Sequence, residues 1–576
     1  SATGRPAALA AMAPHRRVGV IAEHIGGAGA ALDIEDLARR PWLDSRQPRA
    51  SVTAVACSGC SGGGASAAPA PGCGGSAGAS AGALLEEPPR AAGPGHRAAT
   101  GVAWAPRLQT AEDYLASLRG RRLTVYLLGE LLEEPIENAV VWPSVNAVAE
   151  TYRLAEENPE LATAVGFSGY RVSRFLHVAE SSGDLVMQSR MQRELGRRTG
   201  TCFQRCVGMD AINATWSTTY EIDMKHGTNY HERFAGFCRK MQENNFVVGG
   251  AMTDPKGDRS KGPSAQADPD LHVRVSARRP DGGLTIRGAK LHQTGTINSH
   301  WMLIMPGGRM DEVDRDFAIC CAVPVDAPGI TYIYGRQSCD LRALEDGDID
   351  QGNKSFGGQE LTVILEDVIV PKEHIFMDGE YEWTGELVER FTSYHRRSYV
   401  CKAGLGDVLL GAAATVSDYN GTSKASHVRD KLVQIAYLNE NIAGTAMAAS
   451  FEGKRTKAGN YQPDVLMANV CKHNVTQLPY EIARLSQDLA GGLLVTLPSE
   501  KDFRHPVAGA LLEKFLATRE GATVEHRRRI LRLIENMTMG RNAVGYLTES
   551  MHGAGSPQAQ RVVMAKLMDL ERKKQL

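Results

Sequence analysis

Apolar residues recur at helical spacing in two long parts of the chain and at alternating positions in the part between them. From residue 111 to about 245, helical spacing predicts helices, as in NAVAETYRLAEENPELA and DLVMQSRMQRELGRR. From about 246 to 371, LHVRVSARRPDGGLTIRGAKL alternates apolar and polar residues on both sides of an Asp-Gly-Gly turn, which predicts a β-hairpin. AICCAVPVDAPGITYIY and LTVILEDVIVP continue the strand pattern, and helical spacing returns from 381 to 576, as in SHVRDKLVQIAYLNENIAGTAMAA.

The order of helices, strands and helices predicts an α+β protein of several domains. A chain of 576 residues is longer than one hydrophobic core usually supports. We therefore expect an N-terminal helical domain at 108–245, a middle β domain at 246–375 and a C-terminal helical domain at 376–576.

Residues 1–107 differ from the rest of the chain. The stretch 51–107 is mostly Ala, Gly, Ser and Pro and has too few large apolar residues to offset chain entropy, so we expect disorder. Residues 1–50 contain seven Arg but also five acids, which only partly fits an organelle transit segment. Two interpretations stay open, a low-complexity tail without function and a transit segment for a mitochondrion or plastid.

Charge and cysteine content exclude several classes of partner. Lys plus Arg (65) and Asp plus Glu (66) nearly cancel, so there is no electrostatic reason to expect nucleic acid or an anionic membrane as partner. No apolar run in the sequence reaches the roughly 18 residues that span a bilayer. The 11 cysteines are irregularly spaced, which favours reduced thiols or metal ligands over a disulfide framework.

Two segments combine side chains that bind metals or transfer protons. Cys202 and Cys206 stand four residues apart, and on a helix both thiols would lie on one face. HRRSYVCK, which starts at His395, offers an imidazole, a phenol, a thiol and an amine within eight residues. Taken alone, each segment is more often a core cysteine beside a helix end than a ligand set.

Three further segments carry polar groups suited to a cofactor or substrate. The loop GAMTDPKGDR provides donors and cations for a phosphate or an acyl-CoA, or it is an ordinary surface loop. KLHQTGTIN follows an apolar strand and would hydrogen-bond a flat polar cofactor. TESMHGAGSP closes a long helix and brings a carboxylate and an imidazole together. No P-loop, GxSxG, HExxH or strand-linked GxGxxG pattern occurs in a fitting context.

Taken in order, these segments make the chain from about Leu108 onward resemble the 4-hydroxybutyryl-CoA dehydratases (vinylacetyl-CoA Δ-isomerases). This group belongs to the 4-hydroxyphenylacetate 3-hydroxylase family, which has the acyl-CoA dehydrogenase fold. The stretches that carry the resemblance are CFQRCVGMDAINATWSTTYEID, GAMTDPKGDRS, GAKLHQTGTINSH, IYGRQSCDLR, FGGQE, DYNGTSKASHVRDKL and TESMHGAGSPQAQR.

The resemblance implies FAD, a [4Fe–4S] cluster, an acyl-CoA substrate and a homotetramer. It implies as cluster ligands Cys202, Cys206, His395 and Cys401. It implies as catalytic residues His395, Glu549, Tyr399, Lys402, Glu360 and Gln204. Residues expected at the cofactors are His292, Gln293, Thr294, Gly295, Thr253, Lys256, Arg259, Gly491, Gly492 and Ala554, with the glycine pair touching the flavin of a neighbouring subunit.

The implied reaction explains why these cofactors and residues would be needed. The hydrogen on C3 of a 4-hydroxyacyl thioester is not acidic, so simple base chemistry does not remove it easily. Temporary removal of one electron by the flavin, after a base such as His395 takes the C2 proton, would acidify C3. The hydroxyl would leave C4 with the cluster as Lewis acid, Glu549 would be the partner in proton transfer, and the electron would return.

One departure from the family pattern lies inside the implied metal site. The family has HRxSYGGCK, whereas Val400 alone stands between Tyr399 and Cys401 here. On a helix, one missing residue would rotate Cys401 by about 100° relative to His395, whereas a loop would absorb the change. Two explanations stay open, a variant with an altered or absent cluster and an error in a predicted coding sequence.

Two other functions remain as alternatives. The first is a cluster-free flavin-dependent monooxygenase on the same fold. The retained cysteine pair and Glu549 argue against it, because the monooxygenases lack the cysteine ligands. The second is a non-catalytic paralogue that only oligomerises, which would bind no flavin.

Overall fold

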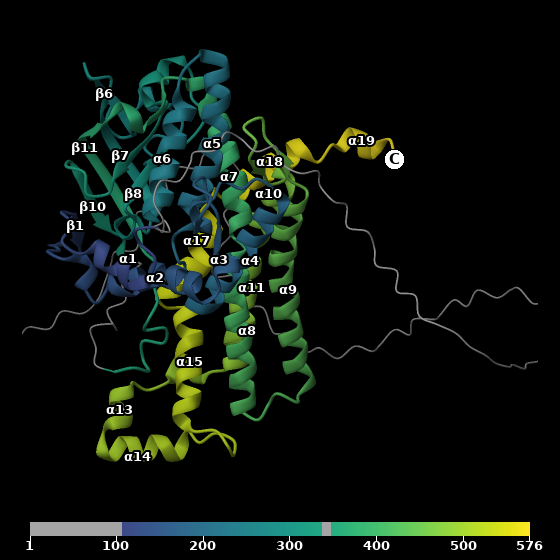
Figure 1. Ribbon diagram of the computed structural model, residues 1–576. Coiled ribbons are helices and arrows are strands. Elements are labelled where there is room, and N and C mark those ends of the chain that lie inside the picture. The colour runs from purple at the N-terminus through teal and green to yellow at the C-terminus, as the bar shows by residue number, and fades with distance from the viewer. Residues whose placement is uncertain (1–105, 337–346) are drawn as a thin grey trace, which may run out of the picture. The chain divides into compact units, whose positions relative to one another are not determined.

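The fold is described from a computed structural model for residues 106–336 and 347–576. The expected tail or transit segment lies outside the described residues, apart from its last two positions. The α+β class and the order of helices, strands and helices are confirmed (Figure 1). The domain boundaries at 108, 246 and 376 stay a prediction.

The first part of the described chain is mainly helical. Its helices are α1 (Ala111–Leu118), α2 (Trp142–Glu157), α3 (Pro159–Ala162), α4 (Ser182–Thr199), α5 (Cys206–His226) and α6 (Tyr230–Asn244). Local sequence sets several helix ends: Thr110 and Ser181 begin α1 and α4 with capping boxes, and Gly200 ends α4 in the left-handed conformation.

The first part also contains four short strands that helical spacing did not predict. They are β1 (Thr124–Leu127), β2 (Glu130–Leu131), β3 (Thr163–Val165) and β4 (Arg171–Ser173). The expectation of helices alone was wrong here, because β1 alternates exposed and buried residues and adds as a parallel strand to β10. The larger sheet therefore draws a strand from outside the middle of the sequence.

Two sheets form the middle of the chain. Their other strands are β5 (Val248–Ala251), β6 (Arg274–Arg278), β7 (Leu284–Thr294), β8 (Trp301–Ile304), β9 (Ile319–Pro324), β10 (Ile330–Tyr334), β11 (Glu360–Val370) and β12 (Ile375–Asp378). The strand orders are β2-β1-β10-β11-β7-β6 and β12-β9-β8-β5. The predicted hairpin is confirmed, since β6 pairs with β7 in antiparallel fashion around Gly282, whose φ is +80°.

Helix α5 packs directly on the smaller sheet. A Cβ added at Gly208 would stand 1.8 Å from the carbonyl oxygen of Val248 on β5, so only glycine permits this approach. The close packing fixes the start of α5, and therefore Cys206, against the sheet.

The last part of the chain is a set of long helices with short ones between them. They are α7 (Thr384–Ser398), α8 (Cys401–Tyr419), α9 (Ser426–Phe451), α10 (Val465–Val475), α11 (Leu478–Ala490), α12 (Leu493–Thr496), α13 (Glu500–Arg504), α14 (Pro506–Phe515), α15 (Val524–Thr538), α16 (Arg541–Ala543), α17 (Glu549–His552), α18 (Pro557–Leu567) and α19 (Leu570–Lys574). The small hairpin of β13 (Lys454–Arg455) and β14 (Tyr461–Gln462) follows α9, and a π-helical turn, η11 (Val544–Thr548), leads into α17. Helix α8 packs against α4, α9, α11 and α15 (Figure 1).

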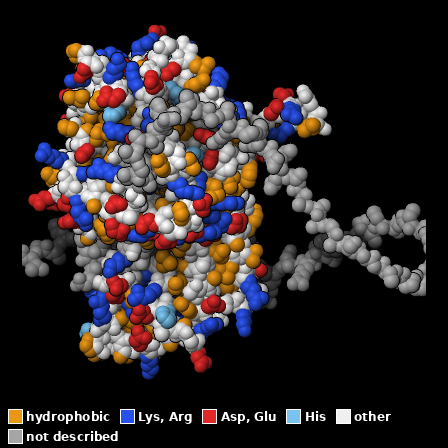
Figure 2. Space-filling model, viewed as in Figure 1, with side chains coloured by type: hydrophobic (Ala, Val, Ile, Leu, Met, Phe, Trp, Pro, Cys, Tyr) orange, Lys and Arg blue, Asp and Glu red, His pale blue; other side chains and the backbone are white. Residues whose placement is uncertain are grey.

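Charged side chains of both signs cover the visible surface, and a long apolar helical stretch is mostly buried. Lysine, arginine and acidic side chains are intermingled over the visible face (Figure 2). Within the described chain, the helical stretch Tyr381–Tyr419 is long and apolar enough to cross a membrane, yet 67% of its apolar window is buried inside the protein. Such burial is typical of a core helix.

Candidate active site

The segment before α5 is held in a conformation that no helix allows. Gln204 has φ of +69°, so Cys202 lies in a loop and only Cys206 belongs to the helix. The expectation that both cysteines sit on one helical face was wrong for this backbone reason. Gln204 is buried, donates to the Ser144 carbonyl (2.9 Å) and accepts from Asn298 Nδ2 (2.8 Å), so its amide joins three segments of the chain.

Three thiols nevertheless come together. Cys401 is the first residue of α8, and the Cys206 thiol hydrogen-bonds the Cys401 sulfur, which lowers the pKa of Cys401. Cys202 lies within electrostatic range of both, and burial raises the pKa of Cys202 and of Cys206. All three are free cysteines.

His395 faces the same side of α5 as this thiol group. Its Nδ1 atom lies 2.8 Å from Oδ2 of Asp210, which stands one helical turn after Cys206. Ser398 donates to the other oxygen of Asp210 at 2.9 Å. A carboxylate on one ring nitrogen fixes the tautomer and the ring plane, and directs the lone pair of Nε2 away from Asp210.

The shortened segment between His395 and Cys401 forms a tight turn. Val400 N donates to Arg397 O, and Lys402 N donates to Tyr399 O at 2.9 Å, so α8 starts afresh after α7 ends. Val400 is fully buried. With Val400 alone between Tyr399 and Cys401, the break between the two helices places Cys401 within hydrogen-bonding reach of Cys206.

A small cavity lies between β11 and the π-turn η11. Its lining consists of Gly358, Gln359, Glu360, Arg541, Val544, Gly545 and Glu549. Glu360 begins β11 opposite Thr294 at the end of β7, and the Thr294 hydroxyl donates to its carboxyl oxygens at 2.9 Å. Burial, together with the nearby Glu549, raises the pKa of Glu360 well above its usual range, so Glu360 is held protonated.

Lys402 is the cation that balances this pair of acids. Its Nζ lies 3.4 Å from Oε2 of Glu549, and its side chain is buried. Burial alone would lower the pKa of Lys402, but Glu549, Cys401 and Cys202 together outweigh it and raise that pKa. One face of the cavity thus carries a charged pair next to a neutral carboxylic acid.

Tyr399 closes the site from the turn between α7 and α8. A Cβ at Gly553 would stand 1.8 Å from its hydroxyl oxygen, so the phenol lies directly on the end of α17. Ala554 has φ of +55°, and its carbonyl accepts from Arg396 Nε at 3.0 Å. Burial raises the pKa of Tyr399, which keeps the phenol protonated.

The predicted cofactor-binding loops meet at a group of cations. His292 has a lowered pKa, first because of burial and then because of Lys256 and His552, so residues from three separate segments lie near one another. Burial and then the positive charge of Arg259 lower the pKa of Lys256. Gln293 and Thr253 serve the backbone here: Gln293 Nε2 donates to Leu291 O, and Leu291 N donates to the Thr253 carbonyl.

Some predicted residues lie elsewhere or have structural roles. Gly295 adopts φ of +68° against Gln204, where a Cβ would stand 2.5 Å away. Gly491 ends α11 and Gly492 follows; within the described part of this chain no atom lies within 4 Å of a Cβ placed at either. The structure of one chain does not bring this pair to the cavity.

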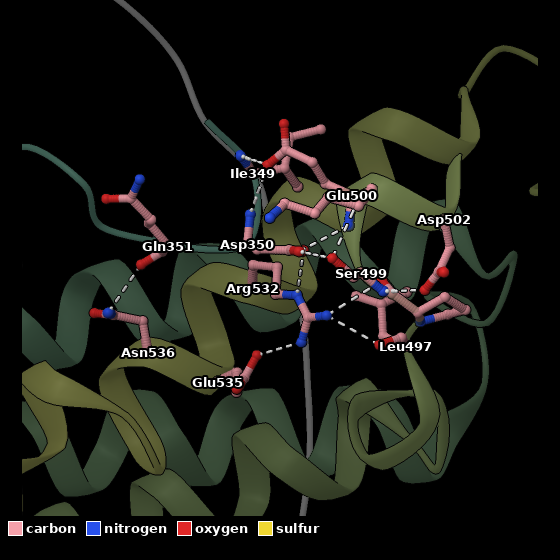
Figure 3. A network of polar contacts seen from close by, with 12 residues as sticks. Ile349, Asp350, Gln351, Leu497, Ser499, Glu500, Asp502, Arg532, Glu535 and Asn536 are labelled. Carbon is pink, nitrogen blue, oxygen red and sulfur yellow. Dashed lines mark hydrogen bonds and ion pairs between the residues drawn. The ribbon is translucent and has the colours of Figure 1, made fainter. Parts of the chain in front are cut away.

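The strand that carries Glu360 is anchored through the segment before it (Figure 3). Asp350 accepts from Arg532 Nε at 3.1 Å and from Glu500 N at 2.7 Å, and Glu500 in turn accepts from Ile349 N at 2.8 Å. Farther along, Gly357 O accepts from Gln204 Nε2. Helices α13 and α15 therefore hold one end of the segment that leads to the cavity.

Residue patterns missed several members of the site. Asp210 and Arg541 were not singled out, and neither was Lys472, which is fully buried on α10. A signal for Lys472 exists: it falls on the buried face of α10 with Ala468 and Val475, where an unpaired lysine is rare. Across residues 106–336 and 347–576, no three His, Cys, Asp or Glu side chains lie close enough to hold a single metal ion.

Comparison with known proteins connects both halves of this architecture to one family. Residues 110–377 match the model of the 4-hydroxyphenylacetate 3-hydroxylase N terminal, and residues 384–576 match that of its C terminal. The 4-hydroxybutyryl-CoA dehydratase/vinylacetyl-CoA-Δ-isomerase of Clostridium aminobutyricum is 52% identical over 483 residues, 81% of this chain and 98% of the relative.

Solved structures agree. An oxygen-tolerant archaeal 4-hydroxybutyryl-CoA dehydratase from N. maritimus has a TM-score of 0.80 at 61% identity, covering 81% of this chain and 93% of that one. The oxygenase component of a 4-hydroxyphenylacetate 3-monooxygenase complexed with FAD has a TM-score of 0.72 at 22% identity, covering 81% and 97%. At that identity the second structure shows a common fold alone.

Proposed function

Since the chain belongs to the 4-hydroxyphenylacetate 3-hydroxylase family, we propose that it dehydrates 4-hydroxybutyryl-CoA to crotonyl-CoA and isomerises vinylacetyl-CoA to crotonyl-CoA. The observation that carries the proposal is the meeting of three thiols beside the Lys402–Glu549 pair. The two relatives above 50% identity, both named as dehydratases, support it.

The thiol group fits an iron–sulfur cluster. Cys202, Cys206 and Cys401 would supply three ligands, and the Nε2 end of His395 the fourth. The donors need not converge on one point, because a [4Fe–4S] cluster presents a separate iron to each ligand. Asp210, bonded to the other ring nitrogen, would orient the imidazole as carboxylates do beside histidine ligands in metal sites. Such a cluster would supply a Lewis acid for the departing hydroxyl.

FAD fits the cation-rich loops. Lys256 and Arg259 offer positive charge to its phosphates or to those of coenzyme A, and the rings of His292 and His552 lie near them as hydrogen-bonding groups. Thr294 and Glu360 present a hydroxyl and a protonated carboxyl at the end of β7. Bound FAD would supply reversible one-electron chemistry, which acidifies the C3 hydrogen.

The chain's own groups would move the protons. His395, oriented by Asp210, would take the C2 proton on Nε2 once that nitrogen is released from the cluster, because its single lone pair cannot serve both roles at once. Glu549, which pairs with Lys402 at 3.4 Å, would accept the second proton from C3. The Tyr399 phenol and the Glu360 carboxyl would donate hydrogen bonds to the thioester or the leaving hydroxyl, while Gln204 holds the backbone around Cys202.

A homotetramer is also proposed. Val507, Leu511 and Phe515 stand four residues apart on α14 and are 66%, 52% and 73% exposed, which makes an apolar stripe. Figure 1 shows α14 at the far end of α15 from the sheets. Contact between subunits would cover this stripe and give the Gly491–Gly492 turn a flavin to touch.

The test is the content and activity of the full chain purified without oxygen. We expect about four irons and one FAD per chain, with formation of crotonyl-CoA from both substrates. FAD without iron, and no dehydration, would overturn the proposal and favour a cluster-free monooxygenase. A colourless protein would favour the non-catalytic paralogue.

A further inference from the structure

A buried lysine that the reaction above does not use stands next to Tyr399. Lys472, on α10, has no exposed surface, and its Nζ lies 4.1 Å from the centre of the Tyr399 ring. The same nitrogen donates to the carbonyl of Ser550, the residue after Glu549 on α17. One amine therefore contacts both the aromatic ring and the helix that carries the acid.

Burial of a positive charge on Lys472 is energetically unfavourable. In the described part of the chain no carboxylate forms an ion pair with Lys472. The charged and titratable groups around it are Arg396 from α7, Tyr399 from the turn after α7, Lys402 from α8, Glu549 from α17 and its own neighbour Cys471. Burial, followed by repulsion from Lys402, lowers the pKa of Lys472 to about 7. A residue kept at such a cost is expected where function requires it.

The two groups that Lys472 contacts are also in contact with each other. The hydroxyl of Tyr399 lies on Gly553, three residues after Ser550, so ring and helix form one unit. Lys472 Nζ contacts both parts of this unit, the ring and the Ser550 carbonyl. The edge-on imidazole of His395 (5.3 Å between ring centroids) and Lys402 Nζ (5.6 Å) also contact this ring. Lys402 reaches α17 only through the Glu549 side chain, whereas Lys472 bonds to the α17 backbone.

We propose that Lys472 is a positioning residue, which holds Tyr399 and α17 in register so that the phenol and the Glu549 carboxylate act on the same substrate. The inference rests on the proposed dehydration. It assigns Lys472 no contact with the substrate and no proton transfer. Displacement of reacting groups by about 1 Å lowers rates by about 100-fold, which sets the expected effect.

The experiment compares Lys472→Met, Lys472→Arg and His473→Gln in the full chain with both cofactors. Methionine keeps the length and removes the nitrogen, arginine keeps a cationic donor, and His473→Gln alters the next, partly exposed residue of the same helix. We expect Lys472→Met to lower kcat about 100-fold with KM within about threefold of wild type, Lys472→Arg to recover at least a tenth of the wild-type rate, and His473→Gln to match wild type.

Stability separates positioning from a structural role. Lys472→Met removes a buried, unpaired charge, so its Tm should equal or exceed that of wild type while kcat falls. A kcat within about twofold of wild type, or a loss of Tm, iron and flavin together with kcat, would overturn the inference. If Lys472→Met does not fold, Lys472→Gln takes its place, with the same criteria. A wild-type chain without dehydratase activity would instead refute the proposed function, a separate outcome.

Discussion

Asp210 accepts a hydrogen bond from Nδ1 of His395 at 2.8 Å, one helical turn along α5 from Cys206. The same helix thus contacts α7 through an imidazole and α8 through a thiol. Because Asp210 is 1% exposed and also accepts from Ser398, it holds the imidazole rigidly. The orientation of the candidate base is therefore set by a residue that lies within the stretch CFQRCVGMDAINATWSTTYEID but was given no role from the sequence.

Asp210→Asn should lower kcat/KM by about 10–100-fold, since an amide presents either an NH2 group or a weaker acceptor to the imidazole. The rate of crotonyl-CoA formation measures this. Ser398→Ala is the matched control, because it removes the other bond to Asp210 and leaves His395 paired; its effect should be less than about threefold. Equal losses in the two variants would contradict an orienting role for Asp210.

Cys401→Ser should abolish most iron binding and leave FAD in place, because a serine oxygen is a poor substitute for a thiolate and the cation-rich loops are untouched. Iron and flavin are assayed on the same anaerobic sample. Cys238→Ser, a change at a buried cysteine of α6 outside the thiol group, should keep its iron. Full iron content in Cys401→Ser would remove Cys401 from the ligand set.

Gln204→Leu should reduce the free energy of unfolding by about 1–3 kcal/mol, because the Ser144 carbonyl and the Asn298 amide lose a buried partner. Denaturant unfolding provides the measurement. Gln192→Leu is the control: Gln192 is fully buried, and among the described residues its amide has no hydrogen-bond partner, so leucine should be neutral or stabilising. The reverse order of stabilities would refute the joining role of Gln204.

Local signals predicted much of the fold, and long-range contacts explain what they missed. The Asp-Gly-Gly turn predicted the β6–β7 hairpin correctly because Gly282 adopts φ of +80°, an angle that glycine reaches without steric strain. Strand β1 was missed because its partner, β10, lies some two hundred residues later. The resemblance named Gln204 and Tyr399 but supplied no geometry, and neither the positive φ of Gln204 nor the buried amine on Tyr399 follows from helical spacing.

Lys472 should make stability depend on pH in a defined direction. Its pKa falls from 10.5 to about 7 on folding, so the unfolded chain binds more protons than the folded chain between these values, and the free energy of unfolding rises with pH across that window. The gain in Tm from Lys472→Met should therefore be largest near pH 7 or below and vanish toward about pH 10. Paired thermal scans test this; a gain independent of pH would contradict the buried titration.

Arg532→Met should loosen the segment that leads to Glu360. It loses bonds to Asp350, Glu535 and the Leu497 carbonyl, and we expect the free energy of unfolding to fall by about 1–3 kcal/mol and kcat to fall with it. Arg529→Met, one turn earlier on α15, removes only an exposed pair and should cost less than about 1 kcal/mol. Unchanged kcat in Arg532→Met would show that the anchor of Figure 3 is separate from catalysis.

The π-turn η11 gives the site an unusual kind of sensitivity. A π-turn accommodates one residue more than an α-turn, and this one ends immediately before Glu549. Lys402, which pairs with Glu549, follows the turn after α7, where Val400 stands in place of the two glycines of the expected family pattern. The direction of each side chain, Glu549 and Lys402, thus depends on the number of residues in the turn before it. Adding or removing one residue there rotates the following helix by about 100°. Insertions and deletions, which substitution scans never sample, are the changes that would separate the two charges most completely.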